Sequence, residues 1–283
     1  MINSDAAQLS AVARFQTLHE QGCFILPNPF DIGSAVYLQH LGFKALATTS
    51  AGFAFTRGLP DEVSAIPRTL MLEHIREIAR ATPLPVNADF QNGYADEPEA
   101  VAESVTQCVA TGVAGLSIED NTGDVSAPLY DDVMAVERIQ AARRAIDQSG
   151  VSVILTARCE AFLVGHPNPF EFSLKRLTQF ADAGADCLYA PGVSSPDQIS
   201  AIVKAVAPKP VNVLVYRPDP NLTLTRLGEL GVRRISVGSA LSRVAWGAFI
   251  KAAQSIASTG EFDALAEGAS FADLNKVFGK KDN

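Results

Sequence analysis

The chain has 283 residues, of which 47% are hydrophobic and 19% are charged, and its formal net charge is −8. That length and apolar content suffice for one large α/β core. The negative charge, without any cluster of Lys or Arg, argues against a nucleic-acid surface. The longest apolar runs fall far short of the ~20 residues that a membrane helix needs.

The N-terminal residues and the cysteines indicate the compartment. Residues Met1–Asp5 contain neither a basic stretch nor an apolar segment, so no signal peptide is predicted. The four cysteines lie in separate segments without a Cys-x-x-Cys pair, which indicates reduced thiols rather than a disulfide framework or a zinc site. We therefore expect a cytoplasmic protein that contacts neither membrane nor nucleic acid.

Eight apolar segments of strand length alternate with segments of helical spacing along the chain, after a first helix at about residues 6–21. Several of the helical segments close on a glycine, which takes the left-handed conformation without steric cost. The strands are uniformly apolar, which is typical of a parallel sheet covered by helices on both faces. The predicted strands are Cys23–Leu26, Ala45–Thr49, Val86–Asp89, Gly115–Glu119, Val151–Arg158, Cys187–Ala190, Val211–Val215 and Ile235–Gly238.

The helical segments between these strands complete eight repeated units. Such units in one domain predict a (β/α)₈ barrel of the TIM type, occupying residues 1–283 as a single domain. A doubly wound open sheet is the competing architecture, but it would need a GxGxxG turn after an early strand, and the sequence has none there. The clearest helical segments are Pro67–Arg80, Glu97–Thr111, Asp131–Gln148, Phe170–Ala183 and Pro196–Val206.

Helical sequence continues past the eighth strand, over Ala240–Ser258 and Phe262–Phe278. This tail is longer than closure of a barrel requires, and it is rich in Ala, Leu and Phe. Apolar surface with nothing left to cover usually packs on a partner subunit. We therefore predict that the helices from about residue 240 serve in oligomerisation, most simply in a homotetramer.

Charged residues stand at three successive strand ends. The third predicted strand ends at Asp89, the fourth runs into Glu119 and Asp120, and the fifth ends at Arg158. The carboxyl ends of barrel strands surround the active site, so these side chains should converge. Carboxylates supply oxygen ligands for a hard cation, and an arginine can hold a substrate carboxylate through two parallel hydrogen bonds. The strand ends thus predict a divalent metal that holds an organic acid, although strand-end acids also serve as helix caps.

The motifs at the strand ends follow one another in a specific order, although each motif alone is weak. They are the Ser/Gly-rich turn at 48–52, Gly58-Leu59-Pro60-Asp61, the run at 89–94, Ile118-Glu119-Asp120, and Ala157-Arg158-Cys159-Glu160-Ala161. From about residue 27 to residue 243, this order resembles the isocitrate lyase/phosphoenolpyruvate mutase superfamily.

The resemblance implies a Mg²⁺ (or Mn²⁺) cofactor and a small 2-oxo acid substrate. Asp89 matches the aspartate that binds the metal directly, and Asp61 and Glu119 match acids that hold its water shell. Gln91 stands where the family has a second aspartate, and its neutral amide removes one ligand charge, on which metal affinity depends. In such sites the metal acts as a Lewis acid on the oxo oxygen while an enolate forms.

The resemblance also implies which residues bind the substrate. The turn after the second strand matches one whose backbone N–H groups hold the substrate carboxylate. Arg158 matches the arginine that pairs with the same carboxylate or with the oxo group. The implied substrate-binding residues are Thr49, Ser50, Ala51, Asp89, Asn121 and Arg158.

The loop after the fourth strand, residues 121–130, departs from the family pattern. Isocitrate and methylisocitrate lyases carry a Lys-Lys/Arg-Cys-Gly-His motif there, whose Cys serves as acid or base, and this loop contains neither Cys nor His. We therefore expect no cleavage of isocitrate or methylisocitrate. A metal-bound water or a rim group such as Tyr94, Glu160 or His166 is then expected to supply the acid or base. The alternative is chemistry such as decarboxylation, in which C–C cleavage itself needs no general base. We take Arg158, Glu160 and Tyr94 as the catalytic candidates.

Three functions remain open. We favour a Mg²⁺-dependent lyase or decarboxylase that cleaves a C–C bond of a small 2-oxo or 2-hydroxy (di)carboxylic acid through an enolate. The second is a phosphonopyruvate-type C–P mutase or hydrolase. The third is a phosphate-binding barrel enzyme that uses Gly238-Ser239-Ala240 at a helix N-terminus. A Schiff-base aldolase would need a lysine at a strand end, and none of the eight ends has one.

Overall fold

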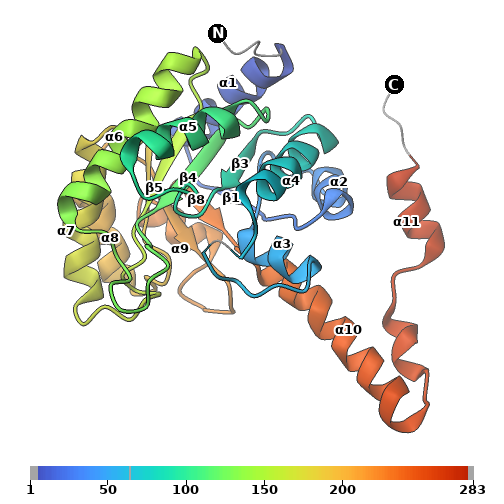
Figure 1. Cartoon of the computed structure of the whole chain (residues 1–283). Coiled ribbons are helices and arrows are strands. Elements are labelled where there is room, and N and C mark those ends of the chain that lie inside the picture. Colours follow the sequence, from blue (N-terminus) through green and yellow to red (C-terminus); the bar gives the residue numbers. More distant parts are fainter. Residues whose placement is uncertain (1–5, 64, 280–283) are drawn as a thin grey trace.

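The computed structural model describes residues 6–63 and 65–279, and within them eight parallel strands form a nearly closed barrel surrounded by helices (Figure 1). The strands are hydrogen-bonded in the order β1-β8-β7-β6-β5-β4-β3-β2. The predicted TIM-type barrel is confirmed. The strands are β1 (Phe24–Leu26), β2 (Leu46–Ala47), β3 (Val86–Asp89), β4 (Gly115–Glu119), β5 (Ile154–Arg158), β6 (Cys187–Tyr189), β7 (Val211–Leu214) and β8 (Arg234–Ser236).

The helices lie on the outside of the barrel, with their ends within two residues of the predicted ones where a range was predicted. The exception is the predicted helix at 262–278, which is divided into the 3₁₀ helix η1 (Asp263–Glu267) and α11, with the extended Gly268 between them. The α-helices are α1 (Ala6–Glu20), α2 (Ile32–His40), α3 (Ser50–Thr56), α4 (Arg68–Ala81), α5 (Pro98–Val109), α6 (Asp132–Ser149), α7 (Pro169–Asp182), α8 (Pro196–Val206), α9 (Leu224–Glu229), α10 (Ala240–Thr259) and α11 (Phe271–Phe278).

Several strand ends differ from the sequence prediction. The fifth strand begins at Ile154 rather than Val151. The N–H of Val153 donates to the carbonyl oxygen of Val151 and therefore forms no hydrogen bond with a neighbouring strand. The turn predicted after the second strand opens the short helix α3, whose first turn Thr49 caps by accepting a hydrogen bond from Gly52 N. Strands β2 and β8 end two residues earlier than predicted, whereas β3, β4 and β5 end as predicted at Asp89, Glu119 and Arg158.

Helix α1 packs close to the barrel at Gly115, the first residue of β4. A Cβ atom at Gly115 would lie 2.8 Å from both Asn87 Oδ1 on β3 and Phe15 Cε1 on α1. Such contacts are shorter than side chains tolerate, so the position requires glycine. Phe15 is fully buried and packs edge-on against His19 of the same helix. The N-terminal helix is therefore part of the barrel core.

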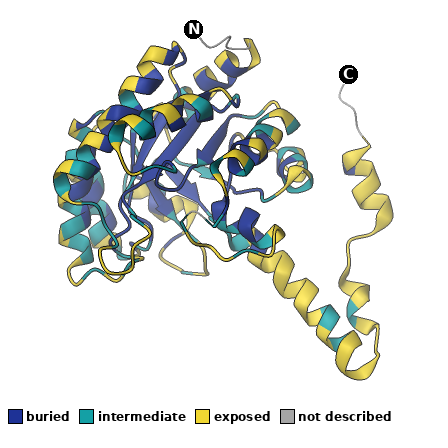
Figure 2. Ribbon diagram, in the orientation of Figure 1, coloured by how far each residue is buried: buried dark blue, intermediate teal, exposed yellow. Residues whose placement is uncertain are grey.

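Helix α10 leaves the barrel, and α10, η1 and α11 are largely exposed (Figures 1 and 2). Only α11 returns to the body of the protein, where it contacts α2. Large apolar side chains are exposed along this segment, among them Val244 at 71%, Phe249 at 61% and Phe271 at 88%. Among the described helices, none combines the length and the apolar character needed to cross a membrane.

We expect the exposed segment from Ala240 onward to bind further copies of the chain, because many of its large apolar side chains are exposed in one copy. Light scattering at micromolar concentration should give a tetramer. Phe249→Asp should produce smaller species, because it places a charge in the expected interface. Val125→Asp, at an apolar residue 95% exposed on a loop, should leave the mass unchanged. A wild-type monomer would contradict the expectation.

Candidate active site

Arg158, at the carboxyl end of β5, lies among the carboxylates of two neighbouring strand ends and of Glu160 in its own segment. Its Nη1 lies 3.4 Å from Asp89 Oδ1, at the end of β3, and 3.2 Å from Glu119 Oε2, at the end of β4. The register explains the meeting, because Glu119 and Arg158 are directly paired between β4 and β5. Of the side chains predicted to converge at the mouth of the barrel, Asp89 and Glu119 meet the guanidinium of Arg158, whereas Asp120 pairs with Arg176.

Glu160 holds the other edge of the same guanidinium. Arg158 Nη2 donates to Glu160 Oε2 at 3.1 Å, and Arg158 Nε donates to Glu160 Oε1. This is the planar, two-point pairing that suits arginine and carboxylate. The backbone N–H of Glu160 in turn donates to Asp120 Oδ1 at 2.8 Å. This geometry directly supports a role of Glu160 in orienting Arg158, a role different from the acid or base considered for it in the sequence analysis.

The site carries more negative than positive charge. Burial raises the pKa of Glu119 well above its ordinary value, and Glu160, Asp89 and Asp120 raise it further against the opposing effect of Arg158. Asp61 is exposed on one side, yet burial of its inner side and the charge of Asp89 also raise its pKa. A cation placed beside these carboxylates would stabilise their ionised form and lower their pKa values again.

The donor set and the charge of this site fit a hard divalent cation. Asp61, Asp89 and Glu119 offer carboxylate oxygens, and Gln91 Oε1 is buried without a hydrogen-bond partner. Among the described residues, however, no three His, Cys, Asp or Glu side chains are already arranged to hold a metal ion. Arg158 lies between Asp89 and Glu119 and partly neutralises both. A cation would therefore share these carboxylates with Arg158.

The turn predicted to bind a carboxylate lies at the site, but Asp89 already uses part of it. Ser50 donates to Asp89 Oδ2 twice, from its backbone N at 2.8 Å and from its Oγ at 3.0 Å. The side chain of Thr49 caps α3, as described above. Ala51 follows Ser50 in the first turn of that helix. A substrate would thus meet a helix start that already holds one carboxylate.

Tyr94 and Asn121 differ in how they face the site. The hydroxyl of Tyr94 is buried without a hydrogen-bond partner, and burial together with the charges of Asp89 and Glu119 raises its pKa far above the ordinary value. Tyr94 therefore stays protonated next to the acidic cluster. Asn121 is turned into its own loop, where its Oδ1 accepts the N–H of Gly123 at 2.9 Å.

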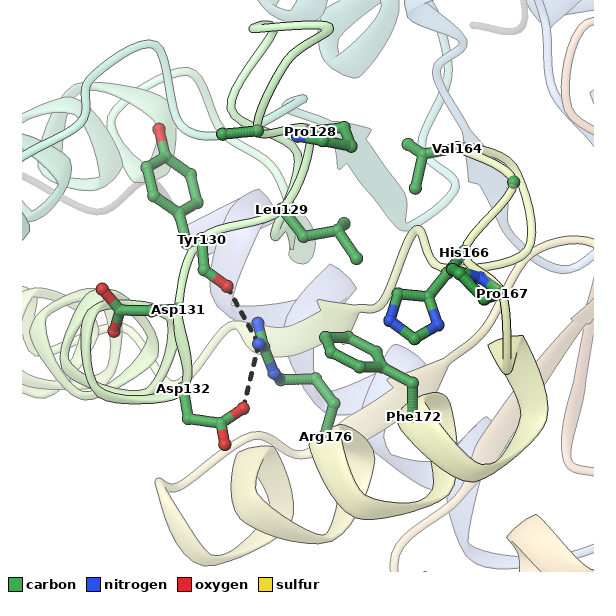
Figure 3. Close-up of a pocket in the computed structure, with 12 residues that line it drawn as sticks. Pro128, Leu129, Tyr130, Asp131, Asp132, Val164, His166, Pro167, Phe172 and Arg176 are labelled. Atoms are coloured by element: carbon green, nitrogen blue, oxygen red, sulfur yellow. Dashed lines mark hydrogen bonds and ion pairs between the residues drawn. The ribbon is translucent and has the colours of Figure 1, made fainter.

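His166 lies apart from the cluster, in a hollow of about 520 Å³ between the loops that follow β4 and β5 (Figure 3). Its ring centroid is 4.4 Å from that of Phe172, and its Nδ1 accepts the N–H of Asn168. The residues that line this hollow include neither Arg158 nor Asp89. The structure therefore does not bring His166 to the other candidate residues.

Arg176 on α7 is a supporting residue that the sequence analysis missed. It is 1% exposed, and its Nη1 lies 3.0 Å from Asp120 Oδ2. Its Nη2 donates to the carbonyl oxygen of Tyr130 and to Asp132 Oδ1, as Figure 3 shows. Burial still raises the pKa of Asp120 to about 6 despite this arginine. Arg176 thus ties the loop after β4 to α7, behind the carboxylates of the site.

A family model described as phosphoenolpyruvate phosphomutase matches residues 15–257. A crystal structure of a candidate lyase/mutase from Burkholderia cenocepacia shares 43% identity, covers 98% of this chain and 99% of its own, and superposes with a TM-score of 0.93. Oxaloacetate acetylhydrolase in complex with oxalate shares 26% identity over 97% of this chain and 96% of its own, with a TM-score of 0.85.

Two curated proteins extend the comparison. An uncharacterized protein of Mycobacterium tuberculosis is 36% identical over 80% of this chain and 81% of its own length. Oxaloacetate decarboxylase 1 of Pseudomonas fluorescens is 30% identical over 77% of this chain and 74% of its own.

We expect Arg176→Met to destabilise the protein by about 3–5 kcal/mol, since it leaves the buried carboxylate of Asp120 without its cation. Urea unfolding monitored by circular dichroism measures the change. Arg144→Met is the matched control, because its pair with Glu99 is exposed and should be worth at most about 1 kcal/mol. Equal stabilities of the Arg176 variant and the wild type would show that Asp120 does not depend on this pair.

Proposed function

The chain belongs to the phosphoenolpyruvate mutase/isocitrate lyase superfamily, and from this premise we propose that it cleaves a carbon–carbon bond of a small 2-oxo or 2-hydroxy dicarboxylic acid. The observation that carries the proposal is the position of Arg158. Its guanidinium is largely buried, fixed by Glu160, and still open at the mouth of the barrel with 17% of its side chain exposed. A cation held in this way is suited to bind and orient an organic carboxylate.

Arg158 and the turn at Ser50 divide the binding of the acid between them. Arg158 offers Nη1, whose present contacts with Asp89 and Glu119 are the longest that it makes. The first turn of α3 offers the backbone N–H of Ala51 and the positive end of a short helix, because the N–H groups of Ser50 and Gly52 already donate to Asp89 and Thr49. Because Glu160 keeps hold of Nε and Nη2, Arg158 can exchange a carboxylate at Nη1 without losing its orientation.

We further propose Mg²⁺ or Mn²⁺ as cofactor, held by Asp89 with Asp61, Glu119 and Gln91 around its water shell. The metal would supply Lewis-acid stabilisation of the developing enolate oxygen. The chain's own contribution is the set of partly uncompensated carboxylates and the unpartnered Gln91 Oε1 described above.

Tyr94 is the proposed hydrogen-bond donor near the bond that breaks. Its hydroxyl has no partner in the structure and, at neutral pH, keeps its proton because its pKa is raised. It can therefore donate a hydrogen bond to an oxygen on which charge develops. Decarboxylation would need no general base for the cleavage itself, which agrees with the absence of Cys and His from residues 121–130.

Two relatives favour C–C over C–P chemistry, since one is named oxaloacetate decarboxylase and the other oxaloacetate acetylhydrolase. Phosphonopyruvate-type chemistry is the second candidate, because the matching family model is described as a phosphoenolpyruvate phosphomutase. The helix start that a phosphate-binding barrel would use is partly occupied by other hydrogen bonds. Within Gly238-Ser239-Ala240, the N–H of Gly238 donates to Asn28 Oδ1 and the N–H of Ala240 donates to the carbonyl oxygen of Val237.

We expect the enzyme to release CO₂, or a small aldehyde or keto acid, from oxaloacetate-like acids in the presence of Mg²⁺ and to leave isocitrate untouched. A panel of 2-oxo and 2-hydroxy diacids with phosphonopyruvate, assayed with Mg²⁺ and with EDTA, measures this. Asp89→Ala should abolish turnover, and Asp197→Ala, at an exposed residue of α8, should not. Full activity in EDTA would refute the metal, and phosphonopyruvate as the only substrate would favour the second candidate.

We expect Glu160→Gln to raise KM by roughly tenfold with a smaller change in kcat, because it loosens the hold on Arg158 without touching the reacting atoms. Arg158→Ala should raise KM further, by a factor that corresponds to several kcal/mol if the substrate pair is buried. Steady-state kinetics on the best substrate of the panel separates the two constants. A fall in kcat at constant KM for the Glu160 variant would instead assign Glu160 to proton transfer.

A further inference from the structure

A second arginine, Arg234, is buried inside the barrel below the candidate active site. It is the first residue of β8 and only 2% exposed. Its Nε donates to Asn212 Oδ1 on β7 at 2.9 Å, and its Nη2 donates to Thr156 Oγ1 on β5 at 2.9 Å. Its Nη1 lies 3.4 Å from Nε2 of His19 on α1. The side chain thus spans the interior of the barrel.

The charge of Arg234 is not balanced by a carboxylate. In the part of the chain that the structure describes, none of its ion pairs includes Arg234. Asn212 and Thr156 are neutral, and burial and the charge of Arg234 lower the pKa of His19 to about 3, so His19 is neutral as well. A buried ion usually needs a counter-ion to offset its desolvation. Here a full positive charge remains among neutral dipoles.

A small polar cavity connects Arg234 to the site above it. Its volume is about 50 Å³, and its lining includes Arg234, Asn212, Ser117, Tyr189, Asp89 and Arg158. Asn87 Oδ1, which is also buried in this region, has no hydrogen-bond partner. The cavity can hold one or a few waters but not a substrate. No apolar layer therefore separates the unpaired cation from the mouth of the barrel.

We propose that Arg234 is a specificity-determining residue, whose unpaired buried charge makes the site favour an acid with two negative charges over an acid of the same shape with one. The inference rests on the proposed function, because it takes the site to bind small organic acids. Arg234 does not touch the acid. It acts through the electrostatic potential that it sets at the mouth of the barrel.

The size of the effect follows from the register of β5. Thr156, which accepts from Arg234, precedes Arg158 by two residues, so the guanidinium of Arg234 lies about 7 Å below the level of Arg158 at ~3.3 Å per residue. A ligand on Arg158 would then lie about 10 Å from the buried charge. With an effective dielectric constant of about 20, one unit of ligand charge at that distance changes affinity roughly tenfold.

Oxalate and oxamate test the inference, since they have nearly the same shape but carry two charges and one. Their affinities are measured by calorimetry at one fixed concentration of free Mg²⁺, and the ratio between them is compared across variants. Chelation of Mg²⁺ by the free ligands is then the same for every variant and cancels when their affinity ratios are compared. Arg234→Met should reduce the preference for oxalate roughly tenfold, and Arg234→Lys should keep it within about threefold.

Two further variants isolate charge from structure. Asn212→Asp places a carboxylate on Arg234 Nε with almost no change of shape. It should therefore remove the preference for oxalate as Arg234→Met does. If Arg234→Met fails to fold, Asn212→Asp alone tests the inference. Arg233→Met removes a positive charge from the neighbouring residue, whose side chain donates to Gly22 O outside the barrel. It should leave the preference for oxalate unchanged.

These experiments distinguish a failure of the inference about Arg234 from a failure of the proposed function. An unchanged preference in Arg234→Met or Asn212→Asp, or equal losses for oxalate and oxamate, would overturn the inference while the binding of acids by the wild type stood. If the wild type binds neither acid, the proposed function fails and the inference fails with it.

Discussion

The ion cluster around Arg158 is the interaction on which the rest of the site depends. Taking a guanidinium and several carboxylates out of water costs several kcal/mol for each ion, and only close, well-oriented pairing offsets that cost. Arg158 has such pairing with Glu160 alone, whereas its contacts with Asp89 and Glu119 are longer. The cluster is therefore held together on one side and left with excess negative charge on the other, where a cation and an acid are proposed to bind.

The barrel makes this arrangement possible through its register. Glu119 and Arg158 are paired between β4 and β5, and Asp89 is paired with Ser117 between β3 and β4. A slip of one residue in either pair would turn the charged side chain from the mouth into the layer of covering helices. Behind the strand ends, Arg176 fixes Asp120, and Asp120 fixes the backbone of Glu160. The orientation of Arg158 is thus supported from α7.

The sequence predicted the barrel and the convergence at its mouth for a physical reason. Uniformly apolar strands and glycine-ended helices are local features, and the strands of a parallel barrel end on the same side, so Asp89, Glu119 and Arg158 were expected to meet. The roles of the tail from Ala240 and of the proposed metal ligands stay predictions.

The contacts that the sequence did not predict depend on packing between distant segments. Arg176 lies in the middle of an amphipathic helix, where an arginine is normally exposed, and only the fold places it against Asp120, 56 residues earlier. In the sequence, Arg234 directly precedes the predicted eighth strand, and no local feature indicates that its side chain points into the barrel. His166 was predicted within reach of the mouth, but the loop after β5 turns it toward Phe172 instead.

The central claim is that one site, organised around Arg158, takes up a divalent cation and a 2-oxo acid together. Calorimetric titration of Mg²⁺ in the presence and absence of pyruvate, and of pyruvate in the presence and absence of Mg²⁺, tests it most directly. Linkage requires each ligand to increase the affinity of the protein for the other by the same factor, and we predict a factor of roughly ten or more. Independent binding of the two ligands, or no binding of either, would contradict the account.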